Sequence, residues 1–160
     1  PILADELIAG GYWSVYYYRG MIYGTEIMRG LDTLKLLPSD YLSANEIAAA
    51  AMAYPSSGPR GLFNPQRQVP MTWPASPVVA RAYIDQLRRT NTLSSAAAKK
   101  IVDVLDQVTA AMDSGGSKKL ARQLDKIRLP KRKSSLDATS RSRLSALADT
   151  LKDISQGLRG

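Results

Sequence analysis

The chain has 160 residues, of which 44% are hydrophobic and 22% charged, and its formal net charge is +8. These proportions are typical of a globular protein, and the length suits one domain or two small ones. Cysteine and histidine are both absent, which excludes disulfides and thiolate ligands and removes the commonest general base and metal ligand, so we expect no metal, no cofactor and no enzymatic activity.

Residues 1–9 form a short stretch of mixed polar and apolar composition, which we interpret as a linker or the end of a preceding strand. The chain opens with Pro1, and no basic-then-apolar signal segment precedes it. We therefore expect it to be the C-terminal end of a longer protein. No apolar run reaches the length of a membrane helix, so the sequence predicts no transmembrane segment.

Residues 10–37 are dense in strand signals. β-branched and aromatic residues alternate there, which suits a half-buried pleated surface. The pairs Arg19-Gly20 and Arg29-Gly30 interrupt the run as turns, and Pro38 ends it. The pattern predicts a three-stranded antiparallel meander. Strict alternation places one set of side chains on one face and Trp13, Val15 and Tyr17 on the other; the first set is Tyr12, Ser14, Tyr16 and Tyr18.

The same stretch, GGYWSVYYYRGMIYGTEIMRGLDTLKL, resembles the last blade of the LVIVD-repeat β-propeller proteins, many of them secreted by actinobacteria. The matching positions are residues 13–18, Ile22-Tyr23, Glu26 and Gly30-Leu31-Asp32. Weaker similarity continues through LPSDYLSANEI and WPASPVVARAYIDQL. The resemblance implies a structural or binding propeller, usually exported, whose upstream blades belong to the same full-length chain. It supplies no catalytic residues.

Three charged residues, Glu26, Arg29 and Asp32, crowd the corner between the second and third predicted strands. One interpretation is a ligand site at the rim of the propeller. The other is a local charge network that holds the turn. No nucleophile or glycine-rich loop accompanies the two carboxylates, so acid–base chemistry has little support.

A short helix and a proline-rich strap follow the meander. Ser43 and Glu46 match a capping box, which predicts a helix from there to about Ala53. Residues 55–75 contain five of the nine prolines, which argues against sheet or helix. The apolar residues of this strap, above all Phe63 and Trp73, predict that it is anchored by burial. A proline-rich ligand for adaptor domains is the alternative.

The remainder of the chain shows helical periodicity. Ser76-Pro77 begins a helix that ends near Thr90, and Ser94 or Ser95 caps a second helix that stops before Gly115-Gly116. Ser117 caps a third, shorter helix, and the last runs from about Ala138 to Gln156. Because each helix is amphipathic and the loops are short, the pattern predicts a small antiparallel bundle.

Charge separates the two halves of the chain. Residues 76–160 contain seventeen Lys and Arg against eight Asp and Glu, a net charge of +9. The basic cluster Lys131, Arg132 and Lys133 is the candidate contact with an anionic surface. Anionic cell-envelope polymers fit an exported propeller, whereas nucleic acid is disfavoured because no aromatic residue for base stacking follows Tyr83. A solvated bundle surface is the simpler interpretation.

The sequence therefore predicts an α+β fold in three parts. Residues 1–54 form a terminal propeller blade with a short capping helix, residues 55–75 the proline-rich strap, and residues 76–160 a basic helical bundle. The expected function is a non-enzymatic scaffold or binding module, secreted or associated with the cell envelope. A basic helical nucleic-acid-binding protein is the alternative, and an enzyme is a third, minor one.

Overall fold

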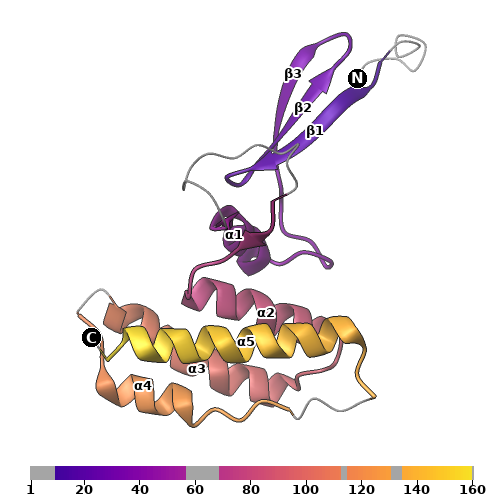
Figure 1. The fold of residues 1–160 in the computed structure, drawn as a ribbon. Helices are drawn as coiled ribbons and strands as arrows, with labels where there is room; N and C mark the ends of the chain where they lie inside the picture. The colour runs from indigo at the N-terminus through magenta and orange to yellow at the C-terminus, as the bar shows by residue number, and fades with distance from the viewer. Residues whose placement is uncertain (1–9, 57–68, 113–114, 131–134, 160) are drawn as a thin grey trace. The chain divides into compact units, whose positions relative to one another are not determined.

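The structure is a computed structural model that describes residues 10–56, 69–112, 115–130 and 135–159. It divides into two compact units, which we name the sheet unit (Pro1–Trp73) and the helical unit (Pro74–Gly160). The described residues form a three-stranded antiparallel sheet, a two-stranded ladder and five helices (Figure 1). The predicted α+β class is therefore confirmed.

The sheet is a meander, as the sequence predicted. Its strands β1 (Tyr12–Tyr18), β2 (Met21–Glu26) and β3 (Gly30–Lys35) pair antiparallel in chain order. Arg19 and Gly20 form the turn between β1 and β2, and their φ angles are 49° and 86°. Two successive left-handed residues give a hairpin turn whose twist matches that of the strands.

An irregularity in β1 changes the face on which Tyr12 lies. The pairing register shifts between Tyr12, which faces Glu26, and Ser14, so Trp13 forms a β-bulge. Residues directly opposite each other on antiparallel strands share a face. Tyr12 therefore lies on the face of Val15. The prediction that Tyr12 shares a face with Ser14 is wrong, because the extra residue of a bulge shifts the side-chain period by one.

Helix α1 (Ala44–Ala51) begins at the predicted capping box. The Ser43 hydroxyl accepts a hydrogen bond from the Glu46 N–H at 3.1 Å, and the Glu46 carboxylate accepts one from the Ser43 N–H at 2.7 Å. Two otherwise unpaired donors are satisfied in this way. The helix ends two residues before the predicted Ala53.

The proline-rich segment contains a short ladder that the sequence analysis did not predict. Strands β4 (Tyr54–Pro55) and β5 (Met71–Thr72) pair antiparallel. Beyond the paired residues, Ser56 donates both its N–H (2.9 Å) and its hydroxyl (3.0 Å) to the Pro70 carbonyl. The expectation of no sheet here is wrong because proline is tolerated at the end of a short edge strand, where no ladder donor is lost.

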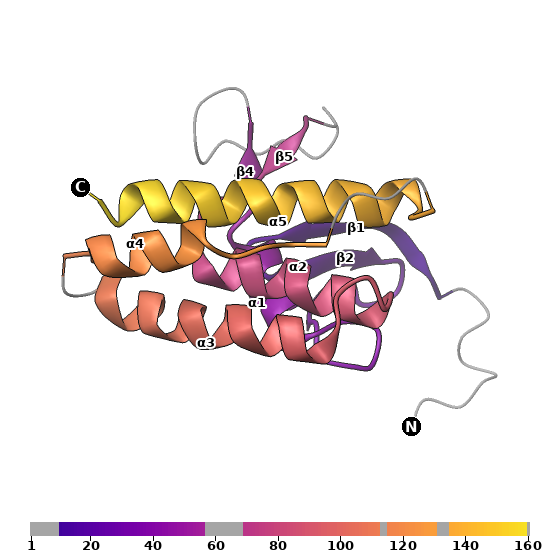
Figure 2. The same cartoon turned by 90° about the horizontal axis from the view of Figure 1, so that it is seen from below.

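The helical unit contains α2 (Pro77–Arg89), α3 (Ser95–Met112), α4 (Lys118–Asp125) and α5 (Ala138–Gly157). These bounds agree with the predicted helices. Helices α2 and α4 both pack against α5, and α3 packs against α2 and α4 (Figures 1 and 2). The four helices share one hydrophobic core, whose fully buried side chains include Ile84, Leu87, Leu105, Val108, Leu144 and Leu147.

Local side-chain chemistry sets the starts of these helices. Ser76, Ser117 and Asp137 each accept a hydrogen bond from a backbone N–H in the first turn of α2, α4 and α5. Ser94 accepts one from Ala97 at 3.3 Å and so begins α3.

Two contacts fix the ends of the bundle. Gly116, with φ 92°, donates its N–H to Ala111 at 3.0 Å, and an added Cβ would lie 2.9 Å from the Leu158 carbonyl oxygen. The buried hydroxyl of Ser155 donates to the Ala121 carbonyl or to the Asp125 carboxylate, at 3.2 and 2.7 Å, and so links α5 to α4.

Within the described residues, no helix is long and apolar enough to cross a bilayer.

Candidate functional site

The predicted corner between β2 and β3 brings Glu26, Arg29 and Asp32 together. Glu26 is buried, and its carboxylate accepts three backbone hydrogen bonds: from Gly11 at 2.9 Å, from Met28 at 2.9 Å and from Arg29 at 2.6 Å. Its oxygens therefore hold the β2–β3 turn and connect it to the chain just before β1.

The second carboxylate of this corner is also engaged within the sheet. Asp32 accepts a hydrogen bond from the Tyr12 hydroxyl at 2.6 Å and one from the Arg29 guanidinium at 2.8 Å, both on the same oxygen. The Arg29 Nε atom lies 3.8 Å from Glu26. One arginine thus lies between two carboxylates across the turn.

These contacts set the ionisation of the corner. The Gly11 N–H, followed by the N–H groups of Arg29 and Met28, lowers the pKa of Glu26 against the opposing effect of its burial. The hydrogen bond from Tyr12, then that from Arg29, lowers the pKa of Asp32. Both groups are held as carboxylates by their own neighbours. The geometry favours the charge network that holds the turn over a ligand site.

The other predicted contact, Lys131, Arg132 and Lys133, lies outside the described residues. Exposed cations do gather on α4 and just after it, where Lys118, Lys119, Arg122 and Lys126 surround the buried Leu120, Ala121 and Leu124. These residues make α4 amphipathic, with one face in the core and a basic face on the surface.

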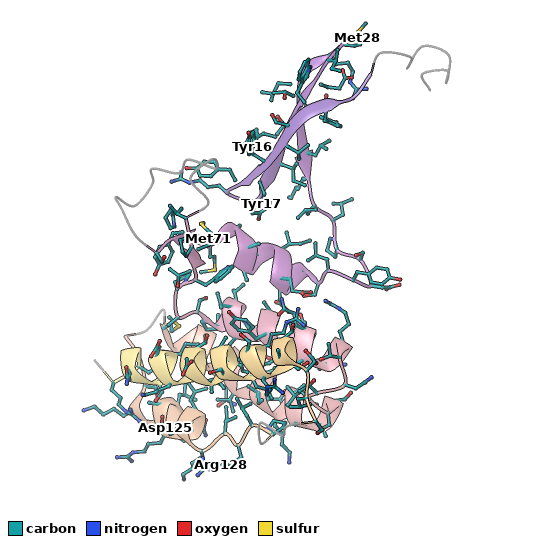
Figure 3. The ribbon with its side chains drawn as sticks, turned by 45° about the vertical axis from the view of Figure 1, so that its right-hand side comes forward. Tyr16, Tyr17, Met28, Met71, Asp125 and Arg128 are labelled. Carbon is teal, nitrogen blue, oxygen red and sulfur yellow. The ribbon has the colours of Figure 1, made fainter. Side chains whose placement is uncertain are left out.

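The largest feature that sequence reasoning missed is a cavity of about 320 Å³ inside the sheet unit. The end of β1 and its turn form one wall, and the end of α1 with the β4–β5 ladder forms the other. Aromatic and apolar side chains provide most of the lining, which comprises Tyr17, Tyr18, Arg19, Ala50, Ala53, Tyr54, Pro55, Met71 and Trp73. Figure 3 shows Tyr17 and Met71 at this end of the sheet unit, with Met28 at the far tip.

Two of the lining residues, Tyr17 and Arg19, carry polar groups. The Tyr17 hydroxyl is buried and has no hydrogen-bond partner among the described residues. Burial raises the pKa of Tyr17, and the nearby backbone of Gly20 partly offsets the rise, so the hydroxyl is a neutral donor. The Arg19 guanidinium lies 5.3 Å from the centre of the Tyr18 ring, and no carboxylate among the described residues pairs with it.

Trp73 corrects one prediction from the sequence. It is 41% exposed and lines the cavity, whereas a strap anchored by burial required it to be buried. Phe63, the second predicted anchor, lies outside the described residues. The apolar residues spaced between prolines were the sequence signal for burial. Trp73, one of these residues, instead lines a partly open cavity, because the facing elements do not close over it.

Among the residues that the structure describes, no three side chains of the metal-binding types cluster closely enough to hold an ion. No protein-family model, curated protein or solved structure matches the chain.

Proposed function

We propose that the chain is the terminal part of a non-enzymatic β-propeller protein of the LVIVD-repeat type, in which β1–β3 form a blade and the protein serves as a scaffold or binding module. Upstream blades of the full-length protein are its first partners. The resemblance of residues 10–37 to the family's last blade suggested this function, and the surface of the sheet supports it.

The observation that carries the proposal is the exposure of large apolar side chains on the sheet. Trp13 is 78% exposed, Leu31 63%, Val15 55% and Leu34 47%. So many exposed large apolar side chains on one small sheet are unusual for a free-standing domain and indicate a surface that another element covers.

These side chains lie on both faces of the sheet. Val15 faces Gly24 across the β1–β2 ladder, and Leu34 faces Ile22 across the β2–β3 ladder, so both belong to one face. Leu31 pairs with Thr25 and belongs to the other. A sheet stacked between two neighbours needs apolar residues on both faces, as a propeller blade does.

The edges of the sheet support the same proposal. β1 and β3 each have one edge without a partner strand among the described residues, and a three-stranded sheet alone has marginal stability. Propeller blades usually have four strands, so the proposal requires a fourth from elsewhere in the full-length protein. Secretion or association with the cell envelope, with anionic envelope polymers as partners of the basic helices, follows from the family resemblance.

The test uses Trp13 as a reporter. The chain contains two tryptophans, so Trp73→Phe leaves Trp13 alone. Tryptophan emission and iodide quenching are compared between the 160-residue chain and the same protein extended by its natural upstream sequence. We expect a red-shifted, readily quenched Trp13 in the shorter protein and a blue-shifted, protected one in the longer protein.

Trp13→Phe, which leaves Trp73 alone, is the matched control and should give similar emission in both proteins. Equal accessibility of Trp13 in the two proteins would contradict the blade proposal, because nothing upstream would then cover the sheet.

A second candidate function, a basic helical nucleic-acid-binding protein, is favoured by one observation. Residues 76–160 carry a net charge of +9, and exposed cations gather on and just after α4. Affinity for random duplex DNA that falls steeply with salt, without affinity for an acidic polysaccharide, would support this candidate over the first.

A further inference from the structure

The cavity between the β1–β2 turn and the β4–β5 ladder has the size and character of a small-molecule site. Its volume of about 320 Å³ falls at the lower end of the range for ligand pockets, about 300–1,000 Å³. Such pockets combine an apolar lining with a few placed polar groups. All of its lining residues belong to the sheet unit.

The apolar part of the lining favours a flat, aromatic ligand. Tyr17, Tyr18, Tyr54 and Trp73 contribute four aromatic side chains, and Met71 adds a flexible, polarisable side chain. Aromatic rings attract one another in offset or edge-to-face arrangements beyond the effect of buried area. Methionine adapts to ring edges.

The polar part of the lining favours an anion. Arg19 contributes a permanent positive charge, and no described carboxylate neutralises it. An arginine guanidinium binds a carboxylate through two parallel hydrogen bonds.

The backbone holds this charge in place. Arg19 has a left-handed backbone conformation, with φ 49°, in a two-residue turn with Gly20. Gly20 lies close to α1, because a Cβ added to it would be 3.4 Å from the Cβ of Ala51. The β1–β2 turn is tight and the β4–β5 ladder is hydrogen-bonded, so both walls of the cavity have a defined backbone. The charged side chain starts from a defined point at the end of the sheet.

We propose that this cavity binds a small aromatic carboxylate. Its ring system lies among Tyr54, Met71 and Trp73, and its carboxylate pairs with Arg19. The proposal does not rest on the propeller function proposed above, because it uses neither the family resemblance nor the exposed apolar side chains of the sheet.

The experiment is a calorimetric titration of the full 160-residue chain with 2-naphthoate, and with 2-naphthamide as the matched neutral probe. Both probes have the same ring system, and one of them lacks the charge. We expect 2-naphthoate to bind at least ten-fold more tightly than 2-naphthamide. Equal affinities, or no binding of 2-naphthoate, would overturn the proposal.

Variants locate the binding site. Arg19→Asn removes the charge, and asparagine tolerates the left-handed turn, so the fold is retained. It should reduce the affinity for 2-naphthoate to that for 2-naphthamide, whereas Arg19→Lys should keep part of the preference for the anion. Arg88→Gln, which removes an exposed charge from the helical unit, should change neither affinity.

One further variant tests the lining. Trp73→Ala should weaken both probes several-fold, because both lose the same ring contact. Circular dichroism and thermal melting confirm that each variant is folded. An unchanged affinity in folded Arg19→Asn would exclude the assigned carboxylate site.

Discussion

The ring of Tyr12 lies directly over Gly24 of the neighbouring strand. A Cβ placed on Gly24 would be 2.5 Å from Tyr12 Cε1 and 2.7 Å from Cδ1. The bulge at Trp13 brings Tyr12 to this face, and the ring extends across β2 so that its hydroxyl reaches Asp32 on β3. One aromatic side chain thus spans all three strands, and the absence of a side chain on Gly24 makes room for it.

Gly24→Ala should destabilise the sheet unit by about 1–3 kcal/mol, as overpacking does. The added methyl group displaces the Tyr12 ring, and the hydrogen bond to Asp32 is lost with it. Both tryptophans belong to the sheet unit, so denaturant unfolding followed by tryptophan fluorescence measures the effect.

In a Tyr12→Ala background, Gly24→Ala should cost much less stability, because no Tyr12 ring remains for the added methyl group to displace. Gly157→Ala is the matched control, since an added Cβ there meets no atom within 4 Å. A cost of Gly24→Ala that persists in the Tyr12→Ala background would show that the contact is not its cause.

Acid should destabilise the sheet unit. Contacts in the folded state lower the pKa of Glu26 and of Asp32 below their ordinary values. A carboxyl group with a lowered folded-state pKa contributes stability above its unfolded pKa, about 4, and that contribution disappears as the pH falls through the folded-state value. The midpoint of denaturant unfolding, followed by tryptophan fluorescence, should therefore drop as the pH falls below about 4.

Glu26→Gln should flatten this pH dependence and lower stability at neutral pH, because the amide replaces an acceptor of three backbone hydrogen bonds. Asp40→Asn, at an exposed carboxylate, is the control and should leave the acid transition in place. An acid transition unchanged by Glu26→Gln would contradict the assignment.

The helical unit should fold by itself. Residues 74–160 contain four capped helices and their own core, so this segment alone should give a helical circular dichroism spectrum and a cooperative thermal transition. Leu147→Ala should cost about 2–5 kcal/mol, because Leu147 is fully buried. Ala110→Gly, at an exposed position of α3, should cost about 1 kcal/mol. A random-coil spectrum of the segment would contradict an independent core.

The 160-residue chain should self-associate through its sheet when nothing covers it. Exposed apolar side chains and unpaired strand edges favour pairing with a second copy. Leu31→Lys should reduce the association measured by sedimentation velocity. Leu37→Lys introduces the same charge at a residue that is 75% exposed and lies beyond the end of β3, so it should have little effect. A chain that stays monomeric at millimolar concentration would contradict this prediction.

The helix ends were predictable from sequence because the chemistry that fixes them is local. Ser43 and Glu46 exchange hydrogen bonds within one turn, and the Ser76 hydroxyl accepts one from the Val78 N–H two residues on. The meander was predictable for the same reason, since its turns lie between adjacent strands.

Long-range contacts explain what the sequence did not predict. The bulge at Trp13 depends on the register with β2, and Tyr54 pairs with Thr72 across eighteen positions. The cavity needs both walls, which come from segments far apart in sequence. The three charged residues of the β2–β3 corner were identified from the sequence, which left a ligand site and a charge network as the two interpretations. The hydrogen bonds from Gly11 and Tyr12 favour the charge network.

The backbone conformation of Arg19 lowers the stability of the turn, whereas its side chain provides the proposed contact with an anion. A left-handed conformation is unfavourable for a residue with a long side chain by about 1 kcal/mol, whereas asparagine and glycine adopt it readily. Optimising the turn for stability alone would therefore select Asn-Gly and remove the cation that Arg19 contributes to the cavity lining. Engineering that screens for a higher melting temperature should converge on such a turn, and the more thermostable proteins it yields should have lost their preference for an anionic ligand.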